Sequence, residues 1–249
     1  MNEINDKFKS LCNILFSKPI GNMDEFQDYF TQYIEQPKVR KTQSGKNTYY
    51  VAPYCDKARF STFDESLQPE NAKPIDINDI KDIDSIVRAV GESQQYTGNK
   101  VLGNSKFVKE SENIIDSSVI YRSSEIVGCE YIAYSDLLRN SRYMFACVSG
   151  GDSSYCLRCM SMNQSQRCFE STVIFYCSDT FYSNNCKSCH NMLFSFDQQA
   201  KKNMIGNNAL SQEKYSEIRN RLIQQMADNL KTKKRLPSLL DFFEEGEDD

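Results

Sequence analysis

The chain has 249 residues, a formal net charge of −4 and a sequence pI near 5.3. This balance gives no overall electrostatic attraction to nucleic acid or to an anionic membrane. The chain has no run of 18 apolar residues, and Glu3, Asp6 and Lys7 near its start do not fit a signal peptide. We therefore expect a cytoplasmic protein, or one held within a virion or particle, that makes no membrane contact.

The segment 1–92 combines helical and strand patterns. Apolar residues recur at helical spacing over 3–16, and Asn22 is placed to cap a second helix that ends before Pro37. The stretches 38–43 and 47–52 flank Ser44-Gly45 and predict a β-hairpin, whereas 76–90 carries the Ile/Val stripe of a further helix. We expect the whole segment to form a small α+β domain that also covers the first coil of the region that follows.

The predicted hairpin mixes basic and aromatic side chains, namely Lys38, Arg40, Lys41, Lys46, Tyr49 and Tyr50. Such a mixture can bind a phosphate backbone. A solvated hairpin face is the simpler explanation, so we do not expect direct binding of nucleic acid.

The region 93–200 has a six-residue repeat, with Ser or Cys in one column and a bulkier, mostly apolar residue three positions later. Such a short, fixed period is typical of a solenoid. We group three sixes into one 18-residue unit, which suits a coil with three short strands that pair with the coils above and below. We therefore predict a mainly β fold, a three-sided β-helix of about six 18-residue coils.

Eight of the ten cysteines lie in this repeat, and six of them form pairs eighteen positions apart: Cys129 with Cys147, Cys159 with Cys177, and Cys168 with Cys186. An 18-residue coil stacks each pair in one column on neighbouring coils, where small buried residues are needed. We expect these cysteines to be thiols, as in a reducing compartment.

Two Cys-x-x-Cys pairs, Cys156 with Cys159 and Cys186 with Cys189, have the spacing of zinc-ribbon knuckles. In the 18-residue register the two pairs fall on different sides and coils, so they would not surround one ion. We expect no cofactor, and zinc at these four residues is the alternative. With His190, the second pair also matches a haem-attachment string, but column packing already explains both cysteines.

His190 is the single histidine of the chain. Enzymes on three-sided solenoids can use one histidine as the general base of acyl transfer. A surface histidine is the simpler explanation, so we assign no catalytic residue and keep a hexapeptide-like acyltransferase using His190 as the alternative. Gly150-Gly151 lacks the rest of a phosphate-binding loop, and we expect it to form a corner of a coil.

After the repeat, Ser211 is placed to cap a helix that runs to about Leu230 and that we expect to cover the last coil. The tail 231–249 is first basic and then acidic. Between these charges lie the apolar residues of a predicted docking motif for a protein partner: Leu236, Leu239, Leu240, Phe242 and Phe243. The alternative is that these side chains fold back onto the chain's own cap helix.

Two resemblances accompany these patterns. Leu239-x-x-Phe242-Phe243 resembles the apolar part of sliding-clamp-binding peptides, although Leu236 stands where those peptides usually carry Gln. The segment 185–192, together with Ile205-Gly206-Asn207 and Glu213-Lys214-Tyr215, resembles the end of uncharacterised Cys-rich β-solenoid repeat proteins of candidate-phylum bacteria, small-genome archaea and large viruses. The second resemblance covers about 111–230, implies the solenoid fold and carries no site.

The sequence thus predicts four parts: an α+β domain (1–92), a solenoid (93–200), a capping helix (201–230) and a tail (231–249). The function we expect is that of a non-catalytic structural scaffold or adaptor that acts by protein–protein binding, for example as a viral or particle component. The alternatives are the acyltransferase and a zinc-binding or sliding-clamp-binding accessory protein of nucleic-acid processing.

Overall fold

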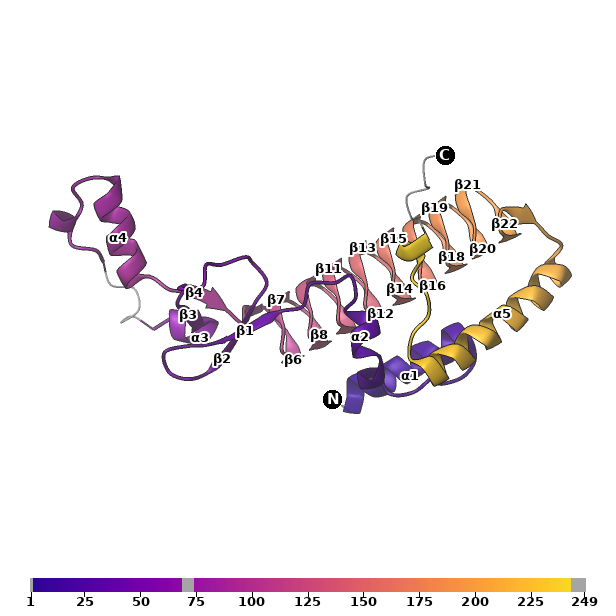
Figure 1. Ribbon diagram of the computed structural model, residues 1–249, viewed down its shortest axis with the longest axis horizontal. Coiled ribbons are helices and arrows are strands. Elements are labelled where there is room, and N and C mark those ends of the chain that lie inside the picture. The colour runs from indigo at the N-terminus through magenta and orange to yellow at the C-terminus, as the bar shows by residue number, and fades with distance from the viewer. Residues whose placement is uncertain (1, 69–73, 243–249) are drawn as a thin grey trace, which may run out of the picture.

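The computed structural model describes residues 2–68 and 74–242 and shows a β-solenoid with helices along one side (Figure 1). Two sheets of stacked parallel strands form the solenoid, one with nine strands and one with ten. The predicted mainly β solenoid is therefore confirmed.

The sheet that packs against helices, which we call the covered sheet, contains the even-numbered strands and β23. They are β6 (Lys106–Lys109), β8 (Ser118–Tyr121), β10 (Glu130–Ala133), β12 (Arg142–Phe145), β14 (Ser154–Leu157), β16 (Gln166–Phe169), β18 (Ser178–Phe181), β20 (His190–Leu193), β22 (Lys202–Ile205) and β23 (Asn208–Ala209). The other sheet, which we call the open sheet, contains odd-numbered strands. They are β5 (Val101–Leu102), β7 (Glu112–Ile115), β9 (Ser124–Val127), β11 (Asp136–Arg139), β13 (Val148–Gly151), β15 (Met160–Asn163), β17 (Thr172–Phe175), β19 (Asn184–Lys187) and β21 (Phe196–Gln199).

One coil of the solenoid spans 12 residues, because the backbone amide of one residue donates a hydrogen bond to the side chain 12 positions earlier, in the preceding coil. Ile120 pairs with Ile132 on the covered sheet and Ile114 pairs with Ile126 on the open sheet, so each strand lies beside the next strand but one. The expected three-sided, 18-residue coil is wrong. Each side of a coil does span six residues, as predicted, but a coil has two sides and not three. Nine such coils replace the expected six. Both periods are multiples of six, so every side repeats the same residue types under either grouping.

The backbone bends at every third residue, where φ is positive. Val119, Arg122 and Glu125 have φ values of 57°, 44° and 54°, and the series continues along the solenoid almost without glycine. This conformation costs a non-glycine residue about 1–3 kcal/mol, and it persists because the surrounding ladder and core hold it. Between bends, the first and fourth residues of each six point inward, which explains the three-residue spacing of small and bulky columns.

The inward Ser residues form a hydrogen-bonded ladder. The Ser117 hydroxyl donates to the carbonyl of Ile115 (2.7 Å) and accepts from the amide of Cys129, one coil further on (2.9 Å). Cys129 occupies the next place in this ladder, where its sulfur accepts from the amide of Ser141 at 3.4 Å. Only a small side chain with a donor and an acceptor can do both, so the ladder explains the Ser/Cys columns.

The remaining inward residues form apolar columns that include Cys156, Cys168 and Cys186, whereas the other five cysteines of the solenoid occupy positions of the Ser ladder. Cysteines one coil apart stack in this interior, namely Cys147 and Cys159, Cys156 and Cys168, and Cys177 and Cys189. The expected 18-residue pairs instead lie on opposite sides of the coil, because that separation amounts to one and a half coils. All ten cysteines are free thiols.

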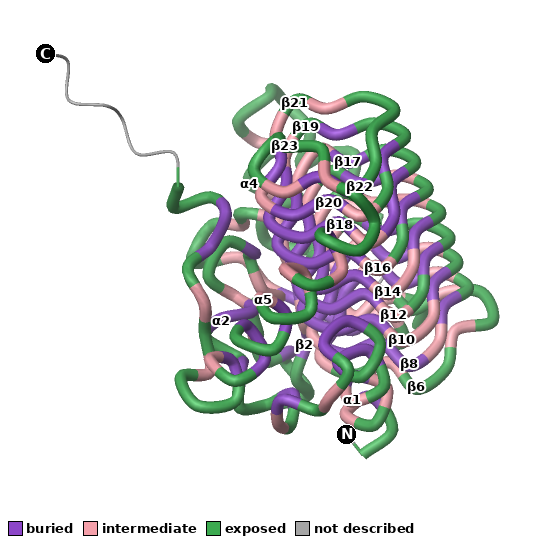
Figure 2. The backbone as a smooth tube through the Cα atoms, turned by 90° about the vertical axis from the view of Figure 1, so that its right-hand side faces the viewer, coloured by how far each residue is buried: buried purple, intermediate pink, exposed green. Residues whose placement is uncertain are grey.

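Helices bury the outer face of the covered sheet. The helix α1 (Asn2–Phe16) crosses β8 to β16, and α5 (Gln212–Lys233) runs from β22 back to α1, while η1 (Met23–Phe26) and α2 (Gln27–Phe30) pack beside them (Figures 1 and 2). Phe8 meets Phe145 with ring centroids 5.4 Å apart, and Phe16 meets Phe169 at 5.1 Å. Ser211 caps α5 as predicted. However, α5 covers the side of the stack and not the end, because its apolar face packs on the row that Phe169 and its neighbours form.

The end near the first coil is covered by β1 (Lys38–Lys41), β2 (Asn47–Tyr50), β3 (Phe60–Thr62), α3 (Phe63–Ser66) and β4 (Tyr96–Gly98). The strands β1 and β2 form the predicted hairpin. The predicted α+β domain at 1–92 is therefore divided, since α1 to α2 belong to the covered side. The helix expected over 76–90 is also divided, into η3 (Ile77–Asp79) and α4 (Ile83–Ser93), and both project from this end (Figure 1).

Candidate binding face

The outer face of the open sheet carries no helix comparable to those on the covered sheet. The strong helix contacts of α1 and α5 within the described residues all go to even-numbered strands or to each other, apart from the contact of α1 with η1. Nine strands spaced about 4.8 Å apart make this face roughly 40 Å long. Its exposed large apolar residues within the described part of the chain are Val101, Leu137, Phe175 and, just after β17, Tyr176.

A shallow hollow of about 500 Å³ lies near the middle of this face. Small residues of β13 and β15 form its floor (Ser149, Gly151 and Ser161), and its rim includes Leu137 and Phe175. The expected corner at Gly150-Gly151 is wrong, because both glycines lie inside β13.

Gly150 points into the solenoid beneath this hollow. A Cβ atom there would lie 3.0 Å from Met162 Cγ and 3.1 Å from Leu138 Cδ2. The glycine therefore makes room for these two larger neighbours, which fill the interior beneath the hollow.

The rest of the face is polar and of mixed charge. Arg139 and Asp152 stand at the hollow. Near one edge, burial raises the pKa of Asp136, although the Ser124 hydroxyl donates a hydrogen bond of 2.5 Å to its carboxylate. The face therefore combines a few exposed apolar side chains with polar and charged surroundings.

A buried ion pair lies at the edge between the two sheets. Arg158 and Glu170, with 5% and 3% of their side chains exposed, are joined in neighbouring coils. Tyr29 of α2 donates to Glu170 Oε1 at 2.5 Å, while the hydroxyl of Ser238 and the amide of Leu239 donate to Oε2 at 3.3 Å. One carboxylate therefore joins the solenoid, α2 and the C-terminal segment.

The C-terminal segment around η4 (Leu239–Phe242) is consequently bound to the chain itself. Leu239 lies in the core at 2% exposure, and Leu236 packs against the same cluster. Leu240 and Phe242 are more than a third exposed, and Phe242 stacks on Tyr182 at 5.8 Å. Phe243 lies outside the described residues. The alternative in which the tail folds back onto the chain therefore applies to Leu236 and Leu239, although these side chains pack on α2 and the covered sheet more than on α5. Docking of a protein partner stays a prediction for Leu240 and Phe242.

His190 is exposed on β20, and its Nδ1 lies 2.7 Å from the hydroxyl of Ser178 on β18. A serine activated by histidine also needs a third group that orients the ring. Within residues 2–68 and 74–242 no carboxylate is hydrogen-bonded to His190. The pair therefore forms a surface hydrogen bond between paired strands of neighbouring coils.

The two Cys-x-x-Cys pairs lie far apart. Cys186 comes two and a half coils after Cys156, which is roughly 12 Å along the axis. Cys156 belongs to the covered sheet and Cys186 to the open sheet. The four cysteines of the zinc alternative, Cys156, Cys159, Cys186 and Cys189, therefore do not meet, and no cluster in the described part of the chain has three His, Cys, Asp or Glu placed for a metal ion.

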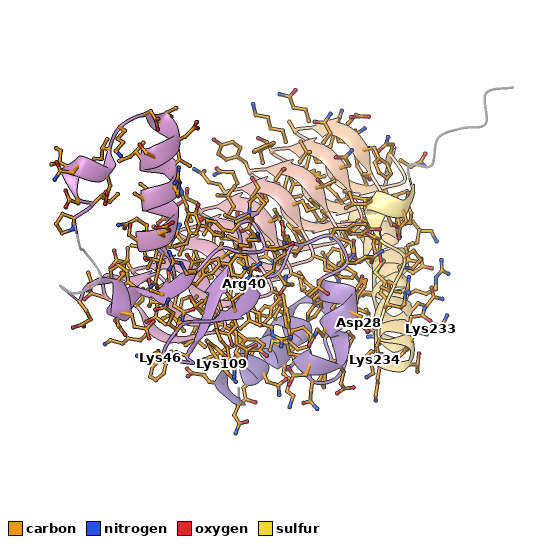
Figure 3. The ribbon with its side chains drawn as sticks, turned by 60° about the vertical axis from the view of Figure 1, so that its left-hand side comes forward. Asp28, Arg40, Lys46, Lys109, Lys233 and Lys234 are labelled. Atoms are coloured by element: carbon orange, nitrogen blue, oxygen red, sulfur yellow. The ribbon has the colours of Figure 1, made fainter. Side chains whose placement is uncertain are left out.

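Two basic side chains of the hairpin, Arg40 and Lys46, bind within the chain. Arg40 donates to the carbonyls of Cys55, Asp56 and Ala58 and lies over the ring of Phe60 at 5.6 Å. Figure 3 shows Arg40 and Lys46 in this end region, and Lys46 is 3.5 Å from Glu65. These contacts favour the solvated-face explanation over a phosphate-binding surface.

No helix in the described parts of the chain is both long and apolar enough to cross a membrane. The resemblances to Cys-rich repeat proteins and to clamp-binding peptides remain predictions. No protein-family model, curated protein or solved structure matches this chain.

Proposed function

We propose that this chain is a non-catalytic scaffold or adaptor that binds a protein partner through the open sheet. The observation that carries the proposal is the difference between the two faces of the solenoid. The chain's own helices bury the covered sheet, whereas no helix among the described residues covers the open sheet in the same way, and Leu137, Phe175 and Tyr176 are exposed there.

The architecture suits such a role because it is stiff. Every coil is bound to the next by backbone ladders on both sheets and by the internal Ser ladder. A rigid face loses little conformational freedom when a partner binds, so more of the contact energy appears as affinity. The apolar anchors around the hollow supply the kind of centre at which binding energy concentrates.

The first coil and the last strand of the covered sheet are less suited to binding. The β-hairpin end region covers the first coil, and β23 pairs antiparallel with β22 at the last coil. Unpaired strand edges would otherwise attract other chains indiscriminately. These capped ends leave the broad face as the surface that we assign to a specific partner, for example in a virion or another particle.

The test is retention of a partner by the immobilised full chain, followed by calorimetry with the purified partner. We expect the double variant Leu137→Asp/Phe175→Asp to lose binding, because both side chains are exposed anchors on the open sheet. Ile14→Asp is the matched control, since Ile14 is about as exposed but lies on α1.

A His190→Ala variant separates binding from catalysis. We expect it to bind the partner as the unmodified chain does. Equal retention of the partner by the Leu137→Asp/Phe175→Asp variant would contradict the assignment of the open sheet, and turnover that His190→Ala abolishes without unfolding would favour the acyltransferase.

A further inference from the structure

The C-terminal segment, residues 236–242, runs from the end of α5 back to the solenoid, where it lies in a groove (Figure 1). The groove, which we call the edge groove, is lined by Phe30, Tyr33 and Ile34 on one side and by Ala146, Glu170 and Thr172 on the other. Leu239 lies in it at 2% exposure, and a gap of only about 30 Å³ remains beside the segment. The edge groove is therefore almost filled by one short peptide segment.

The Glu170 carboxylate in this groove is held in place without the segment. Its Oε1 accepts from the Nε of Arg158 and, at 2.5 Å, from the hydroxyl of Tyr29. Its Oε2 faces the segment and accepts from the hydroxyl of Ser238 and the amide of Leu239, each at 3.3 Å. Hydrogen bonds to a charged acceptor are stronger than those between neutral groups. One prepositioned carboxylate therefore recognises two consecutive residues of the segment.

Two tyrosines fix the direction of the segment in the groove. The Tyr182 hydroxyl donates to the carbonyl of Pro237 at 2.9 Å, and the Tyr33 hydroxyl donates to the Asp241 carboxylate. The Tyr182 ring also stacks on Phe242. Together with Glu170, these contacts match a carbonyl, a hydroxyl, an apolar anchor and a carboxylate in the order of a Pro-Ser-Leu-x-Asp pattern.

The rest of the fold does not depend on this segment. The segment pairs with no strand, and η4 is its one element of secondary structure. None of its residues belongs to the apolar cluster inside the coils, and Leu240 and Phe242 are more than a third exposed. Short terminal segments with few contacts open at much lower free energy than a core does. Opening of the segment therefore leaves the walls of the edge groove in place.

We propose that the edge groove is a peptide-recognition site and that the chain's own C-terminal segment is a tethered ligand that blocks it. The partner that fits is a protein segment with the same Pro-Ser-Leu-x-Asp pattern, which takes the place of the tail. A short tether gives the tail an effective concentration on the order of 1 mM. With an intrinsic dissociation constant on the order of 1–10 µM, the closed state is favoured about 100- to 1,000-fold. The edge groove is distinct from the hollow of the open sheet, so the inference stands whether or not the proposed function does.

Binding of a synthetic peptide in trans tests the site. A fluorescein-labelled peptide with the sequence of residues 236–242 is titrated with the full chain, and its anisotropy reports binding. The unmodified chain should bind the peptide weakly, because its own tail competes. Leu239→Ala removes the anchor of the tail, so this chain should bind the peptide at least tenfold more tightly, with a dissociation constant on the order of 1–10 µM. Leu240→Ala, on the exposed side of the tail, is the matched control and should behave like the unmodified chain.

Two more variants separate opening of the tail from recognition by the groove. Asp241→Asn weakens the tail without a change in the buried side chains, so this chain should also bind the peptide more tightly than the unmodified chain does. Adding Tyr33→Phe/Tyr182→Phe to the Leu239→Ala chain removes both groove hydroxyls and should weaken peptide binding about tenfold, because two hydrogen bonds are lost. Tyr143→Phe, outside the groove, is the control for this loss. Circular dichroism checks that every variant is folded.

Three results would overturn the inference. The first is no binding of the peptide up to about 1 mM by the folded Leu239→Ala and Asp241→Asn chains, since that is the effective concentration of the tail. The second is equal affinity of these chains and the unmodified chain, because the tail would then not occupy the site of the peptide. The third is undiminished binding after Tyr33→Phe/Tyr182→Phe, which would place the peptide elsewhere.

Discussion

Substitution of one buried serine tests whether the Ser ladder stabilises the solenoid. Ser135 lies at a coil corner with 1% exposure. Its hydroxyl donates to the carbonyl of Ala133 at 2.9 Å and accepts from the amide of Cys147, in the next coil, at 3.1 Å. We expect Ser135→Ala to destabilise the protein, because alanine can do neither.

The magnitude follows from the groups left behind. The Ala133 carbonyl still accepts from the amide of Ala146 at 2.9 Å, so its loss is small. The Cys147 amide, in contrast, loses the acceptor that Ser135 supplies in a buried site. An orphaned buried donor costs about 1–3 kcal/mol. For a chain of this length, the thermal midpoint should fall by roughly 2–4 °C for each kcal/mol lost.

Ser135→Cys is the matched control. The sulfur of Cys129 already accepts from a backbone amide in the facing corner column, at 3.4 Å. We therefore expect Ser135→Cys to lose less stability than Ser135→Ala. Thermal and urea unfolding followed by circular dichroism measure both variants, and a change below about 0.5 kcal/mol for Ser135→Ala would refute the stabilising role of the ladder.

Three further predictions concern the tail, the thiols and the end region. Leu239→Ala should lower the free energy of unfolding by about 2–4 kcal/mol, whereas Leu240→Ala on the exposed side should cost less than about 1 kcal/mol; equal midpoints would mean that the tail lies outside the core. In a thiol titration at mild alkaline pH, one cysteine, Cys55, should react quickly and the full ten only after denaturation, because burial raises the pKa of thiols such as Cys129 to about 11. The hydroxyl of Ser44 and a backbone amide hold the pKa of Glu65 at about 2, below the usual 4.5, so its contribution to stability is complete above pH 4.5 and is lost as the pH falls toward 2. A Glu65→Gln variant should lack this part of the acid dependence in an unfolding series, and an unchanged acid profile would contradict it.

The six-residue side of the solenoid could be predicted from sequence, whereas the number of sides could not be predicted from the columns used. The inward residues show only that each six-residue side begins with Ser or Cys, and this pattern is the same for a coil of two sides and a coil of three. Three cysteine pairs have the spacing of a two-sided coil and three have the spacing of a three-sided coil, so the cysteines do not decide between the two.

The outward residues carry the missing information. Glu110 and Arg122 form an ion pair across neighbouring coils, as do Arg167 and Asp179, each at a separation of 12 positions. The rings of Tyr131, Tyr143 and Tyr155 stack at the same interval, with successive centroids 4.8 Å apart. Opposite charges and aromatic residues that recur at this interval would have indicated the two-sided coil.

The tail and α4 could not be predicted in the same way. The apolar residues of both segments have the same spacing whether they pack within the chain or on another protein. What decides the matter for Leu239 is the Glu170 carboxylate, which binds its amide from 69 positions away in the sequence. The separation of α4 from the core likewise depends on how the end region sits on the first coil, which no local pattern contains.

The contrast between the two faces rests on the outward positions of the six-residue side. On the covered sheet the fifth residue of the six, counted from the ladder Ser or Cys, is Phe145 or Phe169, and α1 buries both. On the open sheet the same position is occupied by Arg139 and Gly151. The interior is complete without these rows, because the Ser ladder and the apolar column lie inside the coil. Their open-sheet members therefore contribute little to stability, and they can be substituted for binding without loss of the fold. The Leu137→Asp/Phe175→Asp variant therefore tests partner binding and not folding. The same exchange at buried positions of the covered sheet would disrupt the packing of the helices on that sheet.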